Sequence, residues 1–165
     1  MNNKAIIVCI FIFLVIVNKS FSLENKIITK INNEIVTSID VENEASYLIS
    51  LNTNLKNMNE VEIFEISKRS IIREKIKNIE LKKNFKNIIV PDDIIEKILK
   101  NVYQKLGIKD LKTFKEYLKK NKVDYQFVKK KIGIETLWNE LIILKFESEI
   151  KINEDKIRKD FIANN

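Results

Sequence analysis

The chain has 165 residues, of which 45% are hydrophobic and 32% charged, with a formal net charge of +7 at pH 7. It contains no histidine, and its single cysteine, Cys9, lies in an apolar N-terminal stretch. General acid–base catalysis near neutral pH and zinc binding rely mainly on these two residue types, so the composition argues against an enzyme or a zinc protein. With two glycines and one proline, a glycine-rich phosphate loop is excluded, no cofactor is expected, and a mostly helical fold is predicted.

Residues 1–22 have the pattern of a secretory signal peptide. Lys4 supplies a short positive region, Ala5–Val17 form an apolar run, and small residues precede a cleavage site between Ser22 and Leu23. The apolar run is shorter than the roughly 20 residues that a transmembrane helix needs. We therefore expect export to the periplasm through the Sec pathway. The alternative is a leader that stays uncleaved and anchors the protein to the membrane.

The positive charge of the chain comes almost entirely from lysine. Loss of Lys4 and Lys19 with the leader lowers the net charge from +7 to +5. Proteins that read nucleic acid depend heavily on arginine forks, and export removes the chain from nucleic acid, so we expect no nucleic-acid partner. The cluster Lys129–Lys131 is expected to be a solvated helix face, with attraction of acidic clients or lipid headgroups as the alternative.

A short β-hairpin is predicted at the start of the mature chain. Lys26–Ile31 and Ile35–Thr37 are rich in β-branched residues and flank an Asn-Asn turn, and asparagine tolerates the left-handed conformation that a tight hairpin needs. Ser38 is predicted to cap the helix that follows, with Asp40 in its first turn.

Helical periodicity continues along the rest of the chain, interrupted by a polar loop at Asn52–Asn59. Pro91, Asp110 and Asp124 mark helix starts, and Gly107 fits a left-handed helix end. Gly133 lies inside a helix, where a kink or a close contact is expected. The predicted helices run from Ser38 to about Leu51, Glu60 to about Asn84, Pro91 to Gly107, Leu111 to about Leu118, Tyr125 to about Glu149, and Glu154 to Ala163 after a cap at Asn153.

Acidic pairs and tyrosines are the remaining candidate site residues. Asp92-Asp93 and Glu154-Asp155 both stand at predicted helix starts, where complementation of the helix dipole explains them. Tyrosine combines an apolar body with a polar tip and suits a partly wet peptide groove. Tyr103, Tyr117 and Tyr125 are therefore the candidate residues for contact with a client, against the alternative that they are structural. No catalytic or metal-binding residue is predicted.

The order of these segments resembles the N-terminal domain of SurA-type periplasmic chaperones, in the trigger-factor-like superfamily. The resemblance rests on six segments together with the leader. These are the hairpin Ile27–Thr37 with Ser38-Ile39-Asp40, the helical segment Ser70–Ile76, the helix start Ile89–Ile95, and the aromatic and apolar segments Phe114–Leu118, Tyr125–Lys131 and Glu135–Ile142. The predicted organisation is a signal peptide at 1–22, a chaperone domain at 23–151 with a hairpin and about five helices, and a terminal segment at 152–165.

The resemblance implies a helical module that binds unfolded outer-membrane proteins without ATP or metal. Family members usually continue into parvulin domains with peptidyl-prolyl isomerase activity, and residues 152–165 resemble the segment that leads into such a domain. One alternative is therefore the N-terminal piece of an isomerase whose catalytic domain this chain lacks. Others are a membrane-anchored relative and a helical secreted protein without a chaperone role. Because the chain lacks the parvulin domains and the C-terminal helix of full-length family members, a homodimer or a partner subunit is a further expectation.

Overall fold

The computed structural model describes residues 25–149 together with Lys159 and Ile162. Within this part the chain forms a two-stranded antiparallel hairpin followed by five α-helices, so the predicted mostly helical fold with an N-terminal hairpin is confirmed. The predicted leader with its cleavage site at Ser22 and Leu23 lies outside the described residues. The predicted terminal helix at 154–163, with its acidic pair, does so too, except for Lys159 and Ile162.

The hairpin pairs β1 (Ile27–Ile31) with β2 (Glu34–Thr37), in a register that places Ile31 opposite Glu34. Asn32 turns the chain with a φ of 53°, the left-handed region that asparagine tolerates better than most residues. The hairpin packs on the helices through Val36, which is completely buried beside residues of α2 and α3. This packing supplies the support that an isolated hairpin lacks in water.

Helix α2 (Ser38–Leu51) is capped by Thr37, so the prediction of Ser38 as the cap is wrong by one residue. The Thr37 hydroxyl accepts a hydrogen bond from the Asp40 amide at 3.3 Å, and the Asp40 carboxylate accepts one from the Thr37 amide at 2.8 Å. This reciprocal pairing satisfies two amides at once. The Ser38 hydroxyl instead accepts a hydrogen bond from the Lys26 amide, at 3.1 Å, and ties the start of the helix to the residue before β1.

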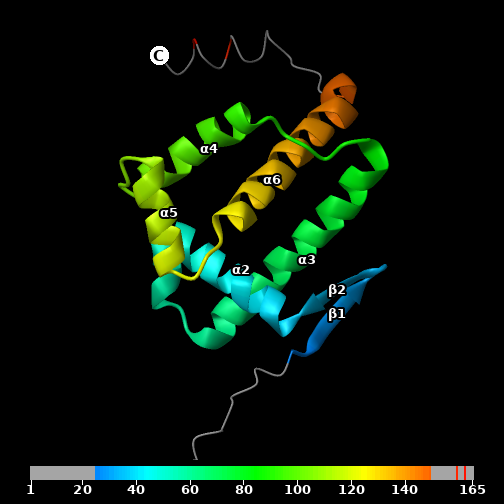
Figure 1. The fold of residues 1–165 in the computed structure, drawn as a ribbon. Helices are drawn as coiled ribbons and strands as arrows, with labels where there is room; N and C mark the ends of the chain where they lie inside the picture. Colours follow the sequence, from blue (N-terminus) through cyan, green and yellow to red (C-terminus); the bar gives the residue numbers. More distant parts are fainter. Residues whose placement is uncertain (1–24, 150–158, 160–161, 163–165) are drawn as a thin grey trace, which may run out of the picture.

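The other helices lie close to their predicted positions (Figure 1). Their bounds are α3 (Glu60–Asn84), α4 (Asp92–Lys105), α5 (Leu111–Lys120) and α6 (Tyr125–Phe146), with short 3-10 helices η1 (Thr53–Asn57) and η2 (Glu147–Glu149). The predicted polar loop after α2 contains η1, since the Asn52 side chain accepts a hydrogen bond from the Asn54 amide and holds the turn.

Helix α6 passes between α3 and α4 and joins the two halves of the fold (Figure 1). On one side, Val128 and Ile132 pack with buried residues of α4 and α5, including Leu99 and Phe114. On the other side, the later turns of α6 pack on Leu81 of α3. These contacts bury residues of α6 as far as Leu141, whereas Ile142, Ile143, Leu144 and Phe146 near its end are exposed.

Two helix ends use the left-handed conformation. Gly107, with a φ of 75°, follows α4, and the Ile108 amide donates to the Tyr103 carbonyl at 3.0 Å, which confirms the predicted helix end. Lys122 takes the same conformation after α5, with a φ of 59°. The sequence did not point to Lys122, because lysine is not a residue that favours this region.

Candidate functional site

An open apolar groove of about 470 Å³ lies between α2, η1 and the start of α3. Its wall on α2 is formed by Val41, Ala45 and Ile49, which are spaced four residues apart and therefore share one helix face. Its other members are Leu55 and Met58, around η1, and Ile63 and Phe64 on α3, with the exposed charged residues Glu42, Lys56 and Glu60 at the edge.

The groove lies at the end where a short connection joins α2 to α3. Asn59 begins α3 through reciprocal hydrogen bonds with Glu62, at 2.9 and 3.2 Å, which fix the direction in which α3 leaves the turn. Phe64, one turn further along, remains 37% exposed. The side chains that line the groove are mostly aliphatic, and Met58 adds a flexible thioether that adapts to irregular shapes.

Chemically, the groove can accept apolar side chains and little else. The ionisable groups around it lie at its edge and are exposed to solvent. Sequence reasoning missed it because Asn52–Asn59 reads as a polar loop. The available signal was the pair Leu55 and Met58, three residues apart within that polar stretch, a spacing that places both on one side of a tight turn.

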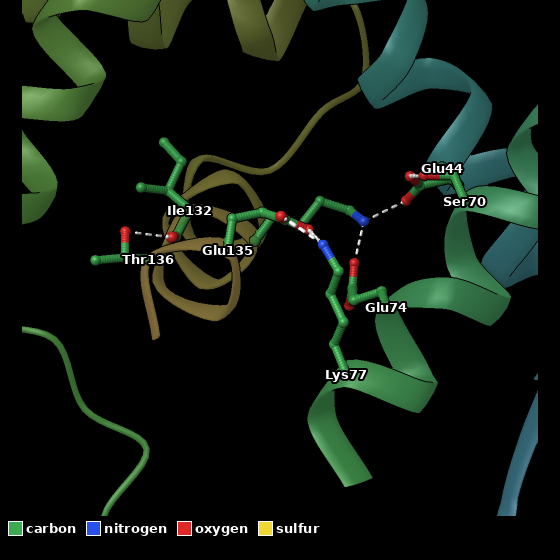
Figure 2. A network of polar contacts seen from close by, with 8 residues as sticks. Glu44, Ser70, Glu74, Lys77, Ile132, Glu135 and Thr136 are labelled. Atoms are coloured by element: carbon green, nitrogen blue, oxygen red, sulfur yellow. Dashed lines mark hydrogen bonds and ion pairs between the residues drawn. The ribbon is translucent and has the colours of Figure 1, made fainter. Parts of the chain in front are cut away.

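A second feature is a buried charge cluster at the meeting point of α2, α3 and α6 (Figure 2). The Lys131 ammonium lies 2.5 Å from a carboxylate oxygen of Glu44 and also pairs with Glu74. The other oxygen of Glu44 accepts a hydrogen bond from the Ser70 hydroxyl at 2.7 Å. Glu44 is completely buried and the Lys131 side chain is 7% exposed. The prediction of a solvated face at Lys129–Lys131 is therefore wrong for Lys131.

Helix geometry explains why Lys131 is buried while its two lysine neighbours are not. Consecutive residues of a helix point about 100° apart, so three neighbouring lysines cannot share one environment. Lys130 is exposed, Lys129 is partly buried and donates to an Asp92 oxygen at 2.8 Å, and Lys131 points to the interior. The carboxylates that hold Lys131 come from positions far away in the sequence.

Aromatic rings and a second ion pair surround the buried cluster. The Lys131 ammonium lies 4.9 Å from the centre of the Tyr47 ring and 5.0 Å from that of Phe127. Burial, together with the nearby Glu44 and other carboxylates, raises the pKa of the Tyr47 hydroxyl. Beside the cluster, Lys77 of α3 donates to both carboxylate oxygens of Glu135 of α6, at 2.7 and 2.6 Å (Figure 2). A cavity of about 270 Å³ adjoins these groups.

The cluster acts as a structural connection between three helices. Each charge lies beside an opposite charge, and the exposed Arg73 is the remaining basic residue around the cavity. Buried ion pairs of this kind add little net stability, but they strongly disfavour arrangements in which one partner is left alone. We therefore assign the cluster to the positioning of α6 against α2 and α3.

The three tyrosines predicted to contact a client pack on the core formed by α4, α5 and α6. Tyr103 is 9% exposed, and its ring lies 5.7 Å from that of Phe114. The Tyr117 hydroxyl donates to the Ser50 carbonyl at 2.8 Å. Tyr125 is partly buried beneath the Lys115 ammonium, and burial raises its pKa. None of the three lines the apolar groove, so a role in client contact stays a prediction.

Among the described residues, no helix combines the length and the apolar character needed to cross a bilayer. In the same part of the chain, histidine, cysteine, aspartate and glutamate side chains form no group of three or more that could hold a metal ion.

Comparison of the chain with protein families, with characterised proteins and with solved structures finds no match. The resemblance to SurA-type chaperones therefore remains a prediction from sequence segments.

Proposed function

We propose that this protein is an exported chaperone module that binds unfolded outer-membrane proteins in the periplasm. Binding is passive: an extended client segment places apolar side chains in the groove between α2, η1 and α3, and its aggregation is slowed without a chemical step. The observation that carries this proposal is the groove itself, which is open, lined mainly by apolar side chains, and has a volume of about 470 Å³. Apolar surfaces of this kind on soluble domains commonly mark binding sites. The resemblance to SurA-type chaperones and the signal-peptide pattern of residues 1–22 support the same function.

The size and chemistry of the groove favour weak and reversible binding. Full burial of one Leu, Ile or Phe side chain contributes about 1.5–3 kcal/mol. A groove that takes two such side chains therefore offers about 3–6 kcal/mol before the entropic cost of association is subtracted. Affinities that follow from this range are weaker than micromolar for a single segment. A chaperone that must release its client benefits from such affinities, because a long client can rebind through several segments.

Suppression of aggregation is the direct test. The protein, expressed from residue 23 onward, is mixed in increasing molar ratio with an unfolded outer-membrane barrel protein diluted from urea, and light scattering is followed. We expect scattering to fall as the ratio rises. A folded sample at several-fold molar excess that leaves the scattering unchanged would contradict the proposed function.

Two matched variants assign the effect to the groove. Phe64→Glu places a charge on the groove wall, whereas Val61→Glu changes a neighbouring side chain that is 73% exposed and does not line the groove. Both add the same charge to the same helix. We expect Phe64→Glu to weaken suppression and Val61→Glu to retain it; equal behaviour of the two variants would place client binding elsewhere.

Native processing tests the location. We expect mass spectrometry of the protein isolated from its source to give an N-terminus at Leu23. A chain that retains residues 1–22 would support the membrane-anchored alternative.

A further inference from the structure

We propose that a second cleft, between α3, the connection that leads to α4, and α6, binds peptide segments in which an apolar side chain is flanked by carboxylates. This inference rests on the proposed function, because it specifies a class of client segment. The cleft has a volume of about 530 Å³. It differs from the first groove in charge, and the two surfaces share no lining residue.

The interior of the cleft is apolar. Val90, Ile95 and Ile134 line it, and Ile95 and Ile134 are buried. Ile89 stands at the edge as a large apolar side chain with 77% of its surface exposed. An isoleucine or leucine side chain of a peptide can therefore enter the cleft and cover Ile89 at the same time.

Gly133 also lines the cleft. It is the one position of α6 in the lining that has no side chain, and a Cβ atom there would lie 3.8 Å from Ile95 Cδ1 and 3.9 Å from Val90 Cγ2. These are ordinary contact distances, so a methyl group fits. A longer side chain at this position would extend into the space that the cleft provides.

The edge of the cleft is basic. Lys82, Lys129 and Lys130 line it against a single carboxylate, that of Asp92. Lys82 pairs with Glu34 at 3.1 Å and Lys129 pairs with Asp92 at 2.8 Å. Lys130 is exposed and has no ion pair with any residue in the described part of the chain. An entering carboxylate therefore meets an unpaired ammonium beside an apolar interior.

The apolar interior and the basic edge together favour one class of peptide segment. A wholly apolar segment gains nothing from Lys130, and a segment whose apolar residue is flanked by lysines is repelled. A segment with Asp or Glu beside the apolar residue satisfies both parts of the cleft. Charge complementarity of this kind acts mainly on selectivity and on the rate of association.

Fluorescence anisotropy with two labelled peptides tests the inference on the protein expressed from residue 23. The peptides share the same isoleucines, flanked by glutamates in one and by lysines in the other. We expect the acidic peptide to bind about five-fold more tightly, as one exposed ion pair allows, and the difference to shrink as salt is added. Equal affinities, or a preference for the basic peptide, would overturn the inference.

Charge-reversal variants locate the effect. Lys130→Glu should abolish the preference for the acidic peptide. The matched control Lys109→Glu changes the net charge equally in the connection between α4 and α5, at the opposite end of α4 from the cleft, and should keep the preference. Gly133→Leu should abolish binding of both peptides by filling the cleft. If that variant does not fold, the comparison of Lys130→Glu with Lys109→Glu still tests whether the cleft binds the acidic peptide. The same loss in Lys130→Glu and Lys109→Glu would overturn the inference.

These experiments distinguish failure of the cleft proposal from failure of the proposed chaperone function. Aggregation suppression that depends on Phe64 but not on Lys130, with no preference between the peptides, would leave the first groove as the binding surface and remove the second. Failure of suppression by the unmodified protein would remove the proposed function itself.

Discussion

Replacement of Lys131 by methionine is the most informative perturbation of the fold. Methionine has similar length and no branch, so packing in the interior is largely kept while the charge is lost. Glu44, which is completely buried, then retains only the hydrogen bond from the Ser70 hydroxyl at 2.7 Å. Its second oxygen has no aligned hydrogen-bond donor among the described residues even when Lys131 is present. The variant therefore leaves a buried carboxylate without its compensating charge.

The expected loss is large. Removal of one partner from a buried ion pair costs about 3–5 kcal/mol, against a total free energy of unfolding of about 5–15 kcal/mol for an ordinary domain. The Lys131 ammonium also lies over the rings of Tyr47 and Phe127, and loss of these cation–π contacts adds to the cost in the same direction. Neutralisation of the orphaned carboxylate should recover part of the loss. Lys131→Met combined with Glu44→Gln is therefore expected to be more stable than Lys131→Met alone.

Urea denaturation followed by circular dichroism at neutral pH measures these differences. Lys130→Met is the matched control, since Lys130 is exposed and a surface substitution of this kind changes stability by about 0.5 kcal/mol or less. A loss below about 1 kcal/mol in Lys131→Met would refute the reasoning that the buried charge is held by Lys131. The absence of any recovery on adding Glu44→Gln would refute the assignment of the cost to that carboxylate.

Three further predictions concern helix interiors, helix ends and pH. Gly133→Ala should raise the free energy of unfolding by about 0.5–1 kcal/mol through helix propensity, because its Cβ meets only contacts of 3.8–3.9 Å; a loss of stability in urea denaturation would show that the site is tighter. Lys122→Gly should stabilise by about 0.5–1 kcal/mol by relieving a φ of 59°, and a lower melting temperature would contradict this. Glu80 accepts a hydrogen bond from Lys145 at 2.9 Å, and this contact, with those from Asn84 and Lys83, lowers its pKa from 4.5 to about 2. The ionised Glu80 carboxylate therefore stabilises the fold above pH 4.5, and this stabilisation is lost as the pH falls from 4.5 toward 2. The difference in unfolding free energy between the unmodified protein and Glu80→Gln should shrink between pH 4.5 and 2 and stay constant above pH 4.5.

Local chemistry made most of the fold predictable. The Asn-Asn turn, the proline before α4, the aspartates before α5 and α6, and Gly107 after α4 each impose a backbone conformation through their own side chains, or through the lack of one. The structure has these elements at the predicted places. Helix α2 begins at Ser38 as predicted, but its cap is Thr37 instead of Ser38, because Thr37 and Asp40 pair reciprocally and satisfy two amides at once.

The sites were less predictable, because they depend on residues that are distant in sequence. Lys131 looks like its two lysine neighbours until Glu44 and Glu74 are brought to it by two other helices. The cleft beside Gly133 requires α3, α4 and α6 together. The three predicted tyrosines carried no local signal that separates a packing role from a binding role, and the structure places them on one core.

Hydrogen exchange with and without a client tests the central claim most directly. The protein is incubated with an unfolded outer-membrane barrel protein, and amide protection is mapped along the chain by mass spectrometry. Occupation of the groove predicts added protection in the segment from Val41 to Phe64, which contains its lining residues, with no such change in α5. Unchanged exchange in that segment, under conditions where the client is demonstrably bound, would contradict the account.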